Sequence, residues 1–389
     1  MSLSLRKINI SQFRSYEAAR LDLTDGADGN IIVLTGANGA GKTNILEAIS
    51  LLVPGKGLRN ADIPEMKNRH AGAQESWAVA AEIETATGEI ARIGTGLDNE
   101  TGRRRVRIDG ETVKSQSALS SLVAAVWLTP QMDRLFLEGA SARRKFLDRL
   151  VAAATPEHSA SLNRYEKAMR ERMKILQGDR PADPTWLSAL ERQMSADGVA
   201  IAAARQALVE RLQNHADHLG AKAPLFPEPL LSLDGWAENE IGRRPAVDIE
   251  DDLKNRLAAA RGEDRASGRT HTGIHRADLA VFNKAKDMPA AQSSTGEQKA
   301  LLVSVILAHA LMMRAEKGFV PIILLDEVAA HLDAARREQL FSLLRALQGQ
   351  VWLTGTDEAV FASLKDEARF FSVAQGRIHG RNVLRALAT

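Results

Sequence analysis

The sequence contains no cysteine, and this absence excludes disulfide bonds, thiolate zinc sites, iron–sulfur clusters and cysteine nucleophiles together. Aromatic residues are scarce at 4% of the chain, which argues against a ladder of rings that stacks single-stranded nucleic acid. Excess charge is also lacking, because 51 Lys and Arg stand against 49 Asp and Glu. Any nucleic-acid binding must therefore come from local basic clusters.

The chain also lacks a hydrophobic run long enough to cross a membrane. The longest apolar stretch, Ala300–Met313, is interrupted by His309 and is shorter than the roughly 20 residues that a bilayer span needs. The first residues lead into alternating polarity, not into the apolar core of a secretory signal. We therefore expect a cytoplasmic protein that makes no contact with a membrane.

What is present is an ordinary globular composition, with 44% hydrophobic and 26% charged residues over 389 positions. At about 150 residues per domain, this length fits one large domain with an insertion, or two to three domains. The first third predicts one helix, over 44–52, among strands. The patterns that predict these strands cover residues 5–10, 31–35, 77–84, 90–95 and 105–109.

The middle of the chain is rich in helix-forming residues from 142 to about 220. A break over 178–184 contains two prolines and predicts an antiparallel helical hairpin, followed by a polar linker that reaches 262–268. A heptad-like seam supports the second helix, although Asp197 and Gly198 interrupt it. The seam residues are Leu187, Leu190, Met194, Ile201, Leu208 and Leu212.

The last third returns to alternating strands and helices, which predicts a parallel sheet. Strands are expected over 322–325, 351–354 and 369–373, with helices after Gly296 and over 334–347. The fold class is therefore α/β. We expect a discontinuous lobe of residues 1–128 and 270–389, with a helical lobe of 129–269 inserted into it.

A complete phosphate loop lies between the strand at 31–35 and the following helix. Its residues are Gly36, Ala37, Asn38, Gly39, Ala40, Gly41, Lys42 and Thr43. Glycines allow consecutive backbone N–H groups to curl around phosphates. Lys42 would reach the β- and γ-phosphates of ATP, and the Thr43 hydroxyl would hold Mg²⁺.

A pair of acidic residues, Asp326 and Glu327, follows the apolar strand 322–325. The carboxyl ends of parallel strands meet at the ligand-binding edge, so both side chains are expected beside the phosphate loop. Asp326 would steady the hydrated Mg²⁺, and Glu327 would polarise the attacking water. The alternative is that the two acids only cap the next helix.

The segment Ser293–Lys299, here called the signature segment, resembles the signature motif of ABC-type ATPases, with Glu297 in place of a glycine. In that class, Ser294, Gly296 and Glu297 would face the γ-phosphate bound by the other subunit. The alternative is structural, because Ser294 and Glu297 have the spacing of a capping box. Two further residues fit the class: Gln131 matches the glutamine that couples the lobes and reaches the metal, and Asp333 matches the loop at the dimer interface.

One feature departs from the ABC pattern. Transporter ATPases carry a histidine after the last core strand, whereas this chain has Thr356 and Asp357 there. The missing histidine argues against the alternative function of a soluble ATPase subunit of an ABC transporter. A phosphate-loop kinase would lack the signature segment.

Four blocks of sequence together resemble the RecF family of bacterial recombination mediators. They are 10–16 around Phe13 and Arg14, 36–49 including Asn44, 129–148, and 273–279 with Ile274 in place of a proline. The resemblance implies that Arg14 contacts adenine or ribose and that Asn44 belongs to the nucleotide site. It also implies a weak, DNA-stimulated ATPase that forms an ATP-dependent homodimer, clamps DNA, and works with RecR and RecO in gap repair, replication recovery and the SOS response.

A basic cluster supplies a candidate DNA surface. Arg103, Arg104, Arg105 and Arg107 lie in the antiparallel meander that the strands at 77–84, 90–95 and 105–109 predict, and residues 254–276 form a second basic stretch. Such clusters bind phosphates without reading bases. We therefore expect sequence-independent binding to duplex or gapped DNA.

Overall fold

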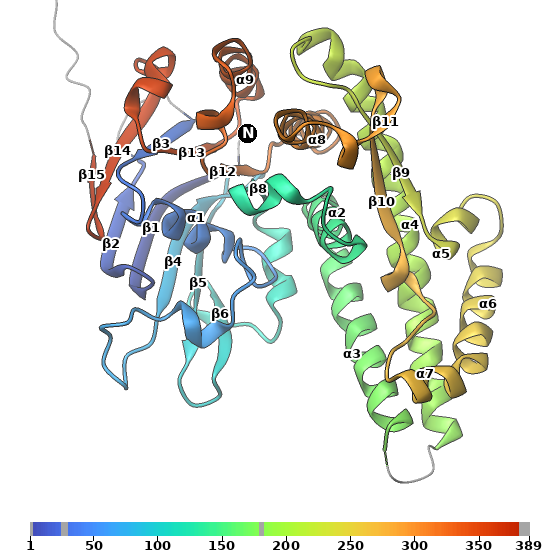
Figure 1. The fold of residues 1–389 in the computed structure, drawn as a ribbon. Coiled ribbons are helices and arrows are strands. Elements are labelled where there is room, and N and C mark those ends of the chain that lie inside the picture. The colour runs from blue at the N-terminus through green and yellow to red at the C-terminus, as the bar shows by residue number, and fades with distance from the viewer. Residues whose placement is uncertain (1–2, 25–29, 179–182, 381–389) are drawn as a thin grey trace, which may run out of the picture. The chain divides into compact units, whose positions relative to one another are not determined.

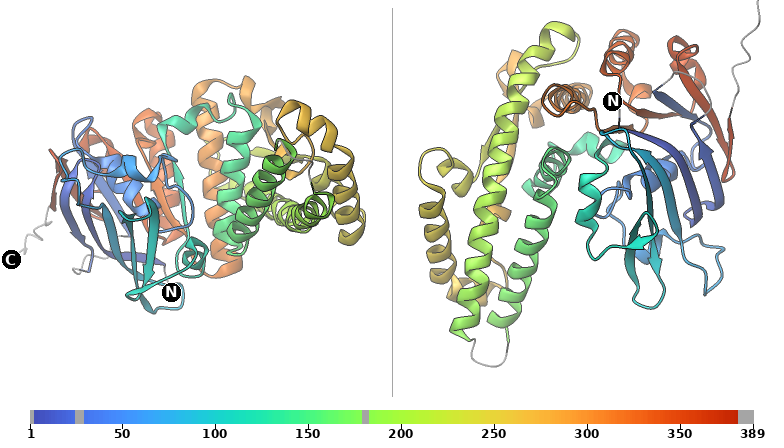
Figure 2. Two further views of the ribbon diagram at one scale, coloured as in Figure 1. Left: turned by 90° about the horizontal axis from the view of Figure 1, so that it is seen from below. Right: turned by 180° about the vertical axis from the view of Figure 1, so that it is seen from behind.

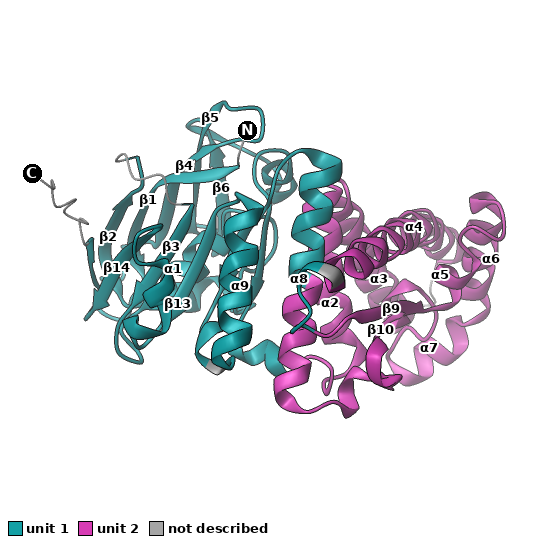
Figure 3. Ribbon diagram, turned by 90° about the horizontal axis from the view of Figure 1, so that it is seen from above, with its two compact units in different colours: residues 1–133, 222–226, 306–389 teal, residues 134–221, 227–305 magenta. Residues whose placement is uncertain are grey.

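The computed structural model describes residues 3–24, 30–178 and 183–380, which form two compact units (Figure 1, Figure 3). The sheet unit comprises residues 1–133, 222–226 and 306–389, and the helical unit comprises 134–221 and 227–305. Residues 270–305 thus group with the helical unit, whereas the sequence pattern grouped them with the other lobe. Pairing between the strands at 229–234 and 278–283 accounts for this difference.

The centre of the sheet unit is a sheet with the strand order β15-β14-β3-β13-β12-β8. All neighbouring strands run parallel except the terminal pair β14 and β15. The strands are β3 (Ile31–Thr35), β8 (Ala125–Leu128), β12 (Ile322–Leu325), β13 (Val351–Gly355), β14 (Ala368–Ala374) and β15 (Arg377–Gly380). Strands β3, β12 and β13 are buried throughout, as their continuous apolar runs predict.

The second sheet of this unit is antiparallel, with the order β2-β1-β4-β5-β6-β7. Its strands are β1 (Ser4–Phe13), β2 (Tyr16–Asp22), β4 (Ala78–Glu84), β5 (Ile90–Asp98), β6 (Arg103–Ile108) and β7 (Glu111–Thr112). The predicted meander is confirmed in β4, β5 and β6. Gln350 joins the two sheets, because its buried amide accepts from Leu5 N–H at 2.9 Å and donates to Leu5 O at 2.8 Å.

Two helices lie wholly within the sheet unit: α1 (Lys42–Ser50) and α9 (Ala334–Leu347). The predicted bounds of α9 are confirmed, and α1 begins two residues earlier than predicted, inside the phosphate loop. Short 3₁₀ helices complete the unit. They are η1 (Ile63–Met66), η2 (Gln116–Ser121), η3 (Pro130–Arg134), η7 (Ala329–His331) and η8 (Glu358–Leu364).

The helical unit consists of α-helices and a small antiparallel sheet of order β11-β10-β9 (Figure 2). The helices are α2 (Ala140–Ala154), α3 (His158–Leu176), α4 (Pro184–Lys222), α5 (Trp236–Glu240), α6 (Ala246–Ala259) and α7 (Arg261–Ser267). The strands are β9 (Pro229–Asp234), β10 (Asp278–Asn283) and β11 (Met288–Pro289), with 3₁₀ helices η4 (Ile274–Arg276), η5 (Lys284–Lys286) and η6 (Ala290–Gln292). The predicted polar linker is therefore wrong, because α6 buries the apolar stripe Ile249, Leu253 and Leu257, and α7 buries Asp264.

Helices α3 and α4 form the predicted antiparallel hairpin. Arg164 of α3 binds Asp197 of α4, while Arg172 further along α3 binds Glu191 earlier in α4, so the two helices run in opposite directions. Residues 179–182, which hold most of the predicted break, lie outside the described residues.

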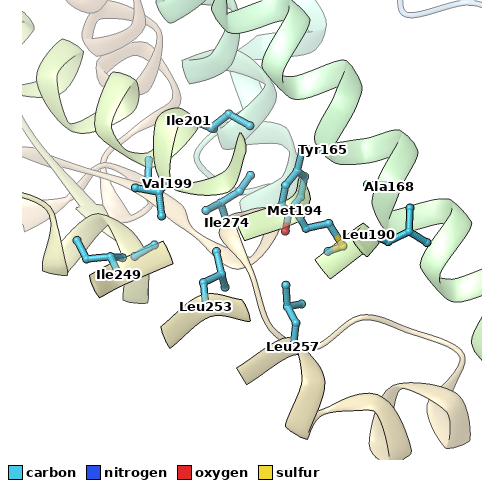
Figure 4. Close-up of a cluster of buried hydrophobic side chains, with 12 residues drawn as sticks. Tyr165, Ala168, Leu190, Met194, Val199, Ile201, Ile249, Leu253, Leu257 and Ile274 are labelled. Carbon is cyan, nitrogen blue, oxygen red and sulfur yellow. The ribbon is translucent and has the colours of Figure 1, made fainter. Parts of the chain in front are cut away.

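Helix α4 continues through Gly198, where the sequence predicted an interruption. A Cβ at Gly198 would lie 3.1 Å from Leu253 Cδ2 and 3.4 Å from Tyr165 Cε2, so the glycine permits close packing rather than ending the helix. All six residues of the predicted seam are buried. Figure 4 shows the core that results, where side chains from α3, α4 and α6 meet around Met194 and Leu253.

Helix α8 (Thr295–Lys317) belongs to the helical unit up to residue 305 and to the sheet unit beyond it. Its 23 residues exceed the apolar stretch identified in the sequence, and among the described residues it alone is long and apolar enough for a membrane span. However, 83% of its apolar window is buried inside the protein. That burial is typical of the core helix of a soluble protein.

Buried ion pairs hold the hairpin to the rest of the helical unit. The fully buried Arg172 binds Glu191 at 2.9 Å, Asp264 at 2.6 Å and the carbonyl oxygen of Leu257 at 2.7 Å. The single guanidinium thereby links α3 with α4, α6 and α7. Removing one partner of such a network leaves a buried charge uncompensated.

We therefore predict that Arg172→Met lowers the free energy of unfolding by about 3 kcal/mol or more, because Asp264 loses its cation. Arg170→Ala on the same helix is the control, since Arg170 is 68% exposed and pairs with the neighbouring Glu166 at i−4. Denaturant unfolding of both variants measures the difference. Equal losses of stability in the two variants would contradict the structural importance of the buried network.

Candidate nucleotide site

The phosphate loop connects β3 to α1 in the sheet unit, as predicted. Two of its glycines are required by close contacts, because a Cβ at Gly36 would collide with the carbonyl oxygen of Val373, and one at Gly41 would lie 2.7 Å from the Tyr16 hydroxyl. Both have positive φ angles, 151° and 115°. By contrast, no atom lies within 4 Å of the Cβ position at Gly39. The loop is thus fixed at both ends and open at its middle, next to the N-terminus of α1, where anions bind.

Lys42 folds back over the loop from the first residue of α1. Its Nζ donates to the carbonyl oxygens of Gly36 at 2.6 Å and Ala37 at 3.0 Å. Burial lowers the pKa of Lys42, and the nearby charges of Glu327 and Asp326 partly oppose this shift. The ammonium is therefore held by the loop carbonyl groups, within the electrostatic influence of the acidic pair.

The carboxylate of Asp326 accepts hydrogen bonds from the hydroxyls of two threonines, which are far from each other in the sequence. Thr43 Oγ1 lies 2.9 Å and 3.0 Å from the two carboxylate oxygens, and Thr354 Oγ1 donates to Oδ1 at 2.7 Å. Thr354 lies near the end of β13, the strand between β3 and β12. Burial raises the pKa of Asp326, whereas the hydrogen bonds from Thr354 and Thr43 act to lower it.

Glu327 occupies a left-handed backbone position with φ of 55°, which is uncommon for a residue other than glycine. Its backbone N–H donates to Thr354 Oγ1 at 2.9 Å, so one threonine fixes both acidic residues. Strained backbone of this kind is held by its surroundings and clusters at functional sites. The side chain is half-buried at the same sheet edge.

The residues at this edge fit a magnesium ion. A threonine hydroxyl and a carboxylate within 3 Å of each other are oxygen ligands, and Mg²⁺ in such sites completes its shell with water and phosphate oxygens. Among residues 3–24, 30–178 and 183–380, no cluster of three His, Cys, Asp or Glu residues could hold a metal unaided. A site that depends on phosphate oxygens agrees with both observations.

Three further residues that the sequence singled out in the sheet unit are Gln131, Asp333 and Asp357. Gln131 lies in η3, just after β8, and β8 adjoins β12 through the bond from Asp326 N–H to Leu128 O. Gln131 is exposed, and so is Asp357, which accepts from Ala359 N–H. Asp333 is the N-cap of α9 and accepts from Arg336 N–H at 2.9 Å.

Arg14 takes part in an ion-pair cluster beside the phosphate loop. Its guanidinium makes two bonds, of 2.9 Å and 2.6 Å, to the fully buried carboxylate of Glu47 in α1. Arg59 binds the same carboxylate at 3.1 Å and also binds Asn44, whose amide donates to Ser15. Arg59 was missed in the sequence, because a lone arginine in an irregular segment carries no pattern, yet its charge acts on Asp326.

The signature segment opens α8 with the capping box that its spacing allows. Ser294 N–H and Oγ both donate to Glu297 Oε2 at 3.1 Å, and Glu297 N–H donates to Ser294 Oγ at 3.4 Å. Gly296 has open space where a Cβ would be. Ser294 therefore forms the capping box that was the structural alternative to a role in phosphate binding. The signature segment belongs to the helical unit, whereas the phosphate loop belongs to the sheet unit.

The arginines of β6 divide between the two faces of the sheet. Arg103, Arg105 and Arg107 are exposed, while Arg104 points inward and donates to the carbonyl oxygens of Leu51 and Gly55 and to Thr95 Oγ1. Burial lowers the pKa of Arg104 to about 10. The prediction that Arg104 contacts DNA does not fit this position, because alternate residues of a strand face opposite sides.

A phosphate loop, an acidic pair at the end of the next-but-one strand and a signature segment that opens a helix define an ABC-type ATPase head. The family model described as the RecF/RecN/SMC N-terminal domain matches residues 4–379. The chain belongs to the RecF family. It is 48% identical to the DNA replication and repair protein RecF of Caulobacter vibrioides, over 94% of this chain and 95% of that one. The RecF protein of Rhizobium johnstonii is 45% identical, over 97% and 98% of the two chains.

Solved structures agree on the fold. A structure described as the recombination mediator protein RecF-ATP in the RecFOR pathway has a TM-score of 0.83 at 22% identity and covers 98% of both chains. The Smc head domain of Pyrococcus furiosus has a TM-score of 0.53 at 16% identity, covering 98% of this chain and 97% of that one. The alternative of a transporter subunit is wrong, because relatives that match nearly the full length are RecF proteins.

The buried carboxylate of Asp326 leads to a prediction about pH. The pKa of Asp326 is raised in the folded protein, so the ionised carboxylate destabilises the fold at pH values above the ordinary pKa of aspartate. This destabilisation decreases as the pH falls through the raised pKa, because the carboxylate is then protonated. Asp326→Asn keeps an oxygen acceptor for both threonines, so we expect the variant without nucleotide to be more stable than the original protein near neutral pH.

Denaturant unfolding at several pH values checks this prediction. The stability gain should shrink as the pH falls toward about 4, the ordinary range of aspartate. Asp366→Asn, at an exposed position, serves as the control and should show no such trend. If Asp326→Asn is the less stable protein at neutral pH, the carboxylate is compensated in the nucleotide-free state and our interpretation is wrong.

Proposed function

We propose that the chain binds Mg²⁺ and ATP at the phosphate loop and hydrolyses ATP slowly, as a timing switch for DNA binding in recombinational repair. The observation that carries the proposal is the contact between Thr43 and Asp326 at 2.9 Å, which brings two of the three expected metal ligands together beside the loop. The relatives named DNA replication and repair protein RecF, and the solved RecF-ATP structure, support the same role.

The residues of the sheet unit divide the chemistry among them. Lys42 leaves the carbonyl oxygens of Gly36 and Ala37 and binds the β- and γ-phosphates, while the loop N–H groups surround them. Thr43 and Asp326 would hold the metal, with Gln131 as a further ligand. An Mg²⁺ ion held there would supply positive charge for the charge that develops on the phosphates. Glu327 then orients a water and accepts its proton.

The helical unit completes the site of a second copy. A helix N-terminus with Ser294 and Gly296 offers donors to a γ-phosphate, and an ATP between two copies would act as part of the interface. Asp333 would lie at the same interface. We therefore propose an ATP-dependent homodimer with two composite sites, in which Arg14 and Asn44 contact the nucleoside part of ATP.

The dimer would hold DNA through charge alone. Arg103, Arg105 and Arg107 present a basic strand face, here called the arginine face, that can neutralise phosphates of duplex or gapped DNA without reading bases. We propose DNA-stimulated ATP hydrolysis in the cytoplasm, with release of DNA after hydrolysis. The solved RecF structures are described within the RecFOR pathway, which supports RecR and RecO as partners.

Replacing the proposed general base should trap the dimer. We expect Glu327→Gln to bind ATP but to hydrolyse it about 100-fold more slowly or worse, since the amide cannot accept the proton from water. Sedimentation with ATP, ADP or no nucleotide measures the result, and Glu358→Gln in η8 is the control. If Glu327→Gln remains monomeric at saturating ATP, the proposed clamp is wrong.

Removing the arginine face should weaken DNA binding at every sequence. The variant Arg103→Ala, Arg105→Ala, Arg107→Ala should flatten the salt dependence of binding by roughly one unit of slope for each DNA phosphate that is no longer neutralised. Titration of gapped duplex at several salt concentrations measures it. Lys365→Ala, an exposed charge elsewhere in the same unit, is the control. An unchanged slope would mean that the arginine face does not bind DNA, and residues 254–276 would then be the next candidate surface.

A further inference from the structure

Three hydrogen-bond donors converge on the carboxylate of Glu297. The N–H and hydroxyl of Ser294 reach Oε2, each at 3.1 Å, and the ammonium of Lys286 lies 2.5 Å from Oε1. The two carboxylate oxygens therefore serve different partners. One oxygen belongs to the capping box, and the other is held by a lysine from η5.

This arrangement creates a conflict at the proposed γ-phosphate site. The donors that Glu297 occupies on Ser294 are the donors that a phosphate at the start of α8 would need. A free carboxylate there would also repel the phosphate, because like charges at an interface oppose association. Glu297 stands where the common ABC motif has a glycine, so the conflict comes from this chain's own residue.

Lys286 is carried to Glu297 by the turn between two paired strands. It lies at the end of η5, between the paired strands β10 and β11, and the next residue, Asp287, has a left-handed φ of 47°. The first residue of η5, Lys284, pins the same turn to Asp217 at 2.9 Å and Glu228 at 3.2 Å. Both lysines of this turn therefore make ion pairs, but only Lys286 contacts Glu297.

We propose that Lys286 is a positioning residue for the γ-phosphate bound by the second copy. It holds the Glu297 carboxylate through Oε1 and neutralises its charge, so that Ser294 can exchange the carboxylate for the phosphate. The proposal rests on the composite site of the proposed function. Lys286 itself makes no contact with the nucleotide.

A double-mutant cycle tests the proposal in the full-length protein. The variants are Lys286→Ala, Glu297→Gln and the two combined, and the readout is the concentration of Mg²⁺-ATPγS that gives half-maximal dimer in sedimentation. Gln retains the capping box, so the helix start is preserved in the second variant. Lys284→Ala is the matched control, because it removes a lysine of similar exposure from the same turn, together with its ion pairs to Asp217 and Glu228, and leaves Glu297 paired.

We expect Lys286→Ala to need about tenfold more ATPγS, since each interface then contains uncompensated like charges. Glu297→Gln and the double variant should be less impaired than Lys286→Ala, because neither carries the carboxylate, and Lys284→Ala should resemble the original protein. The defect of Lys286→Ala should also shrink at 1 M salt, where the Debye length is about 3 Å.

Two results would overturn the proposal. Equal impairment of Lys286→Ala and Glu297→Gln would mean that the ion pair only supports the fold. A double variant as impaired as Lys286→Ala would mean that the lysine acts on something other than Glu297. If the original protein forms no dimer with any nucleotide, the proposed function itself fails, which is a distinguishable outcome. Thermal unfolding of each variant confirms that it folds.

Discussion

The structure of the nucleotide site depends on one buried carboxylate. Asp326 accepts hydrogen bonds from the hydroxyls of Thr43 in α1 and Thr354 in β13, and the strand that it follows, β12, lies beside β13. Thr354 also receives the N–H of Glu327, whose backbone is held in a left-handed position. Hydrogen bonds within the sheet unit therefore position Asp326, Thr43 and the backbone of Glu327 relative to one another. Such preorganisation is what electrostatic catalysis requires.

The arginines of this chain differ in function according to what surrounds them. Arg172 is fully buried between two carboxylates and holds helices together, and Arg104 directs its donors to backbone carbonyl groups. Arg103, Arg105 and Arg107, on the other face of β6, are exposed and remain candidates for binding DNA. The residue type alone does not separate these roles, because the separation follows from the strand's alternation and from burial.

Strands β3 and β12 were predicted with their observed bounds, because continuous apolar runs between turns are distinctive. The phosphate loop, Asp326 and Glu327 were found by the spacing of their residues. Helices α6 and α7 were missed, since their apolar positions are few and separated by charges. Arg59 and Lys286 could not be found in the sequence, because their importance lies in tertiary ion pairs.

In the proposed mechanism, each ATP lies between the phosphate loop of one copy and Ser294 of another. ATP hydrolysis by mixed variants tests this composite site most directly, with Lys42→Ala and Ser294→Arg each inactive alone. Random equimolar mixing makes about half of the dimers mixed, each with one intact site of two, so about a quarter of the original activity should return. Recovery of no more than the sum of the two separate activities would contradict the composite site and leave Ser294 as the cap of its own helix.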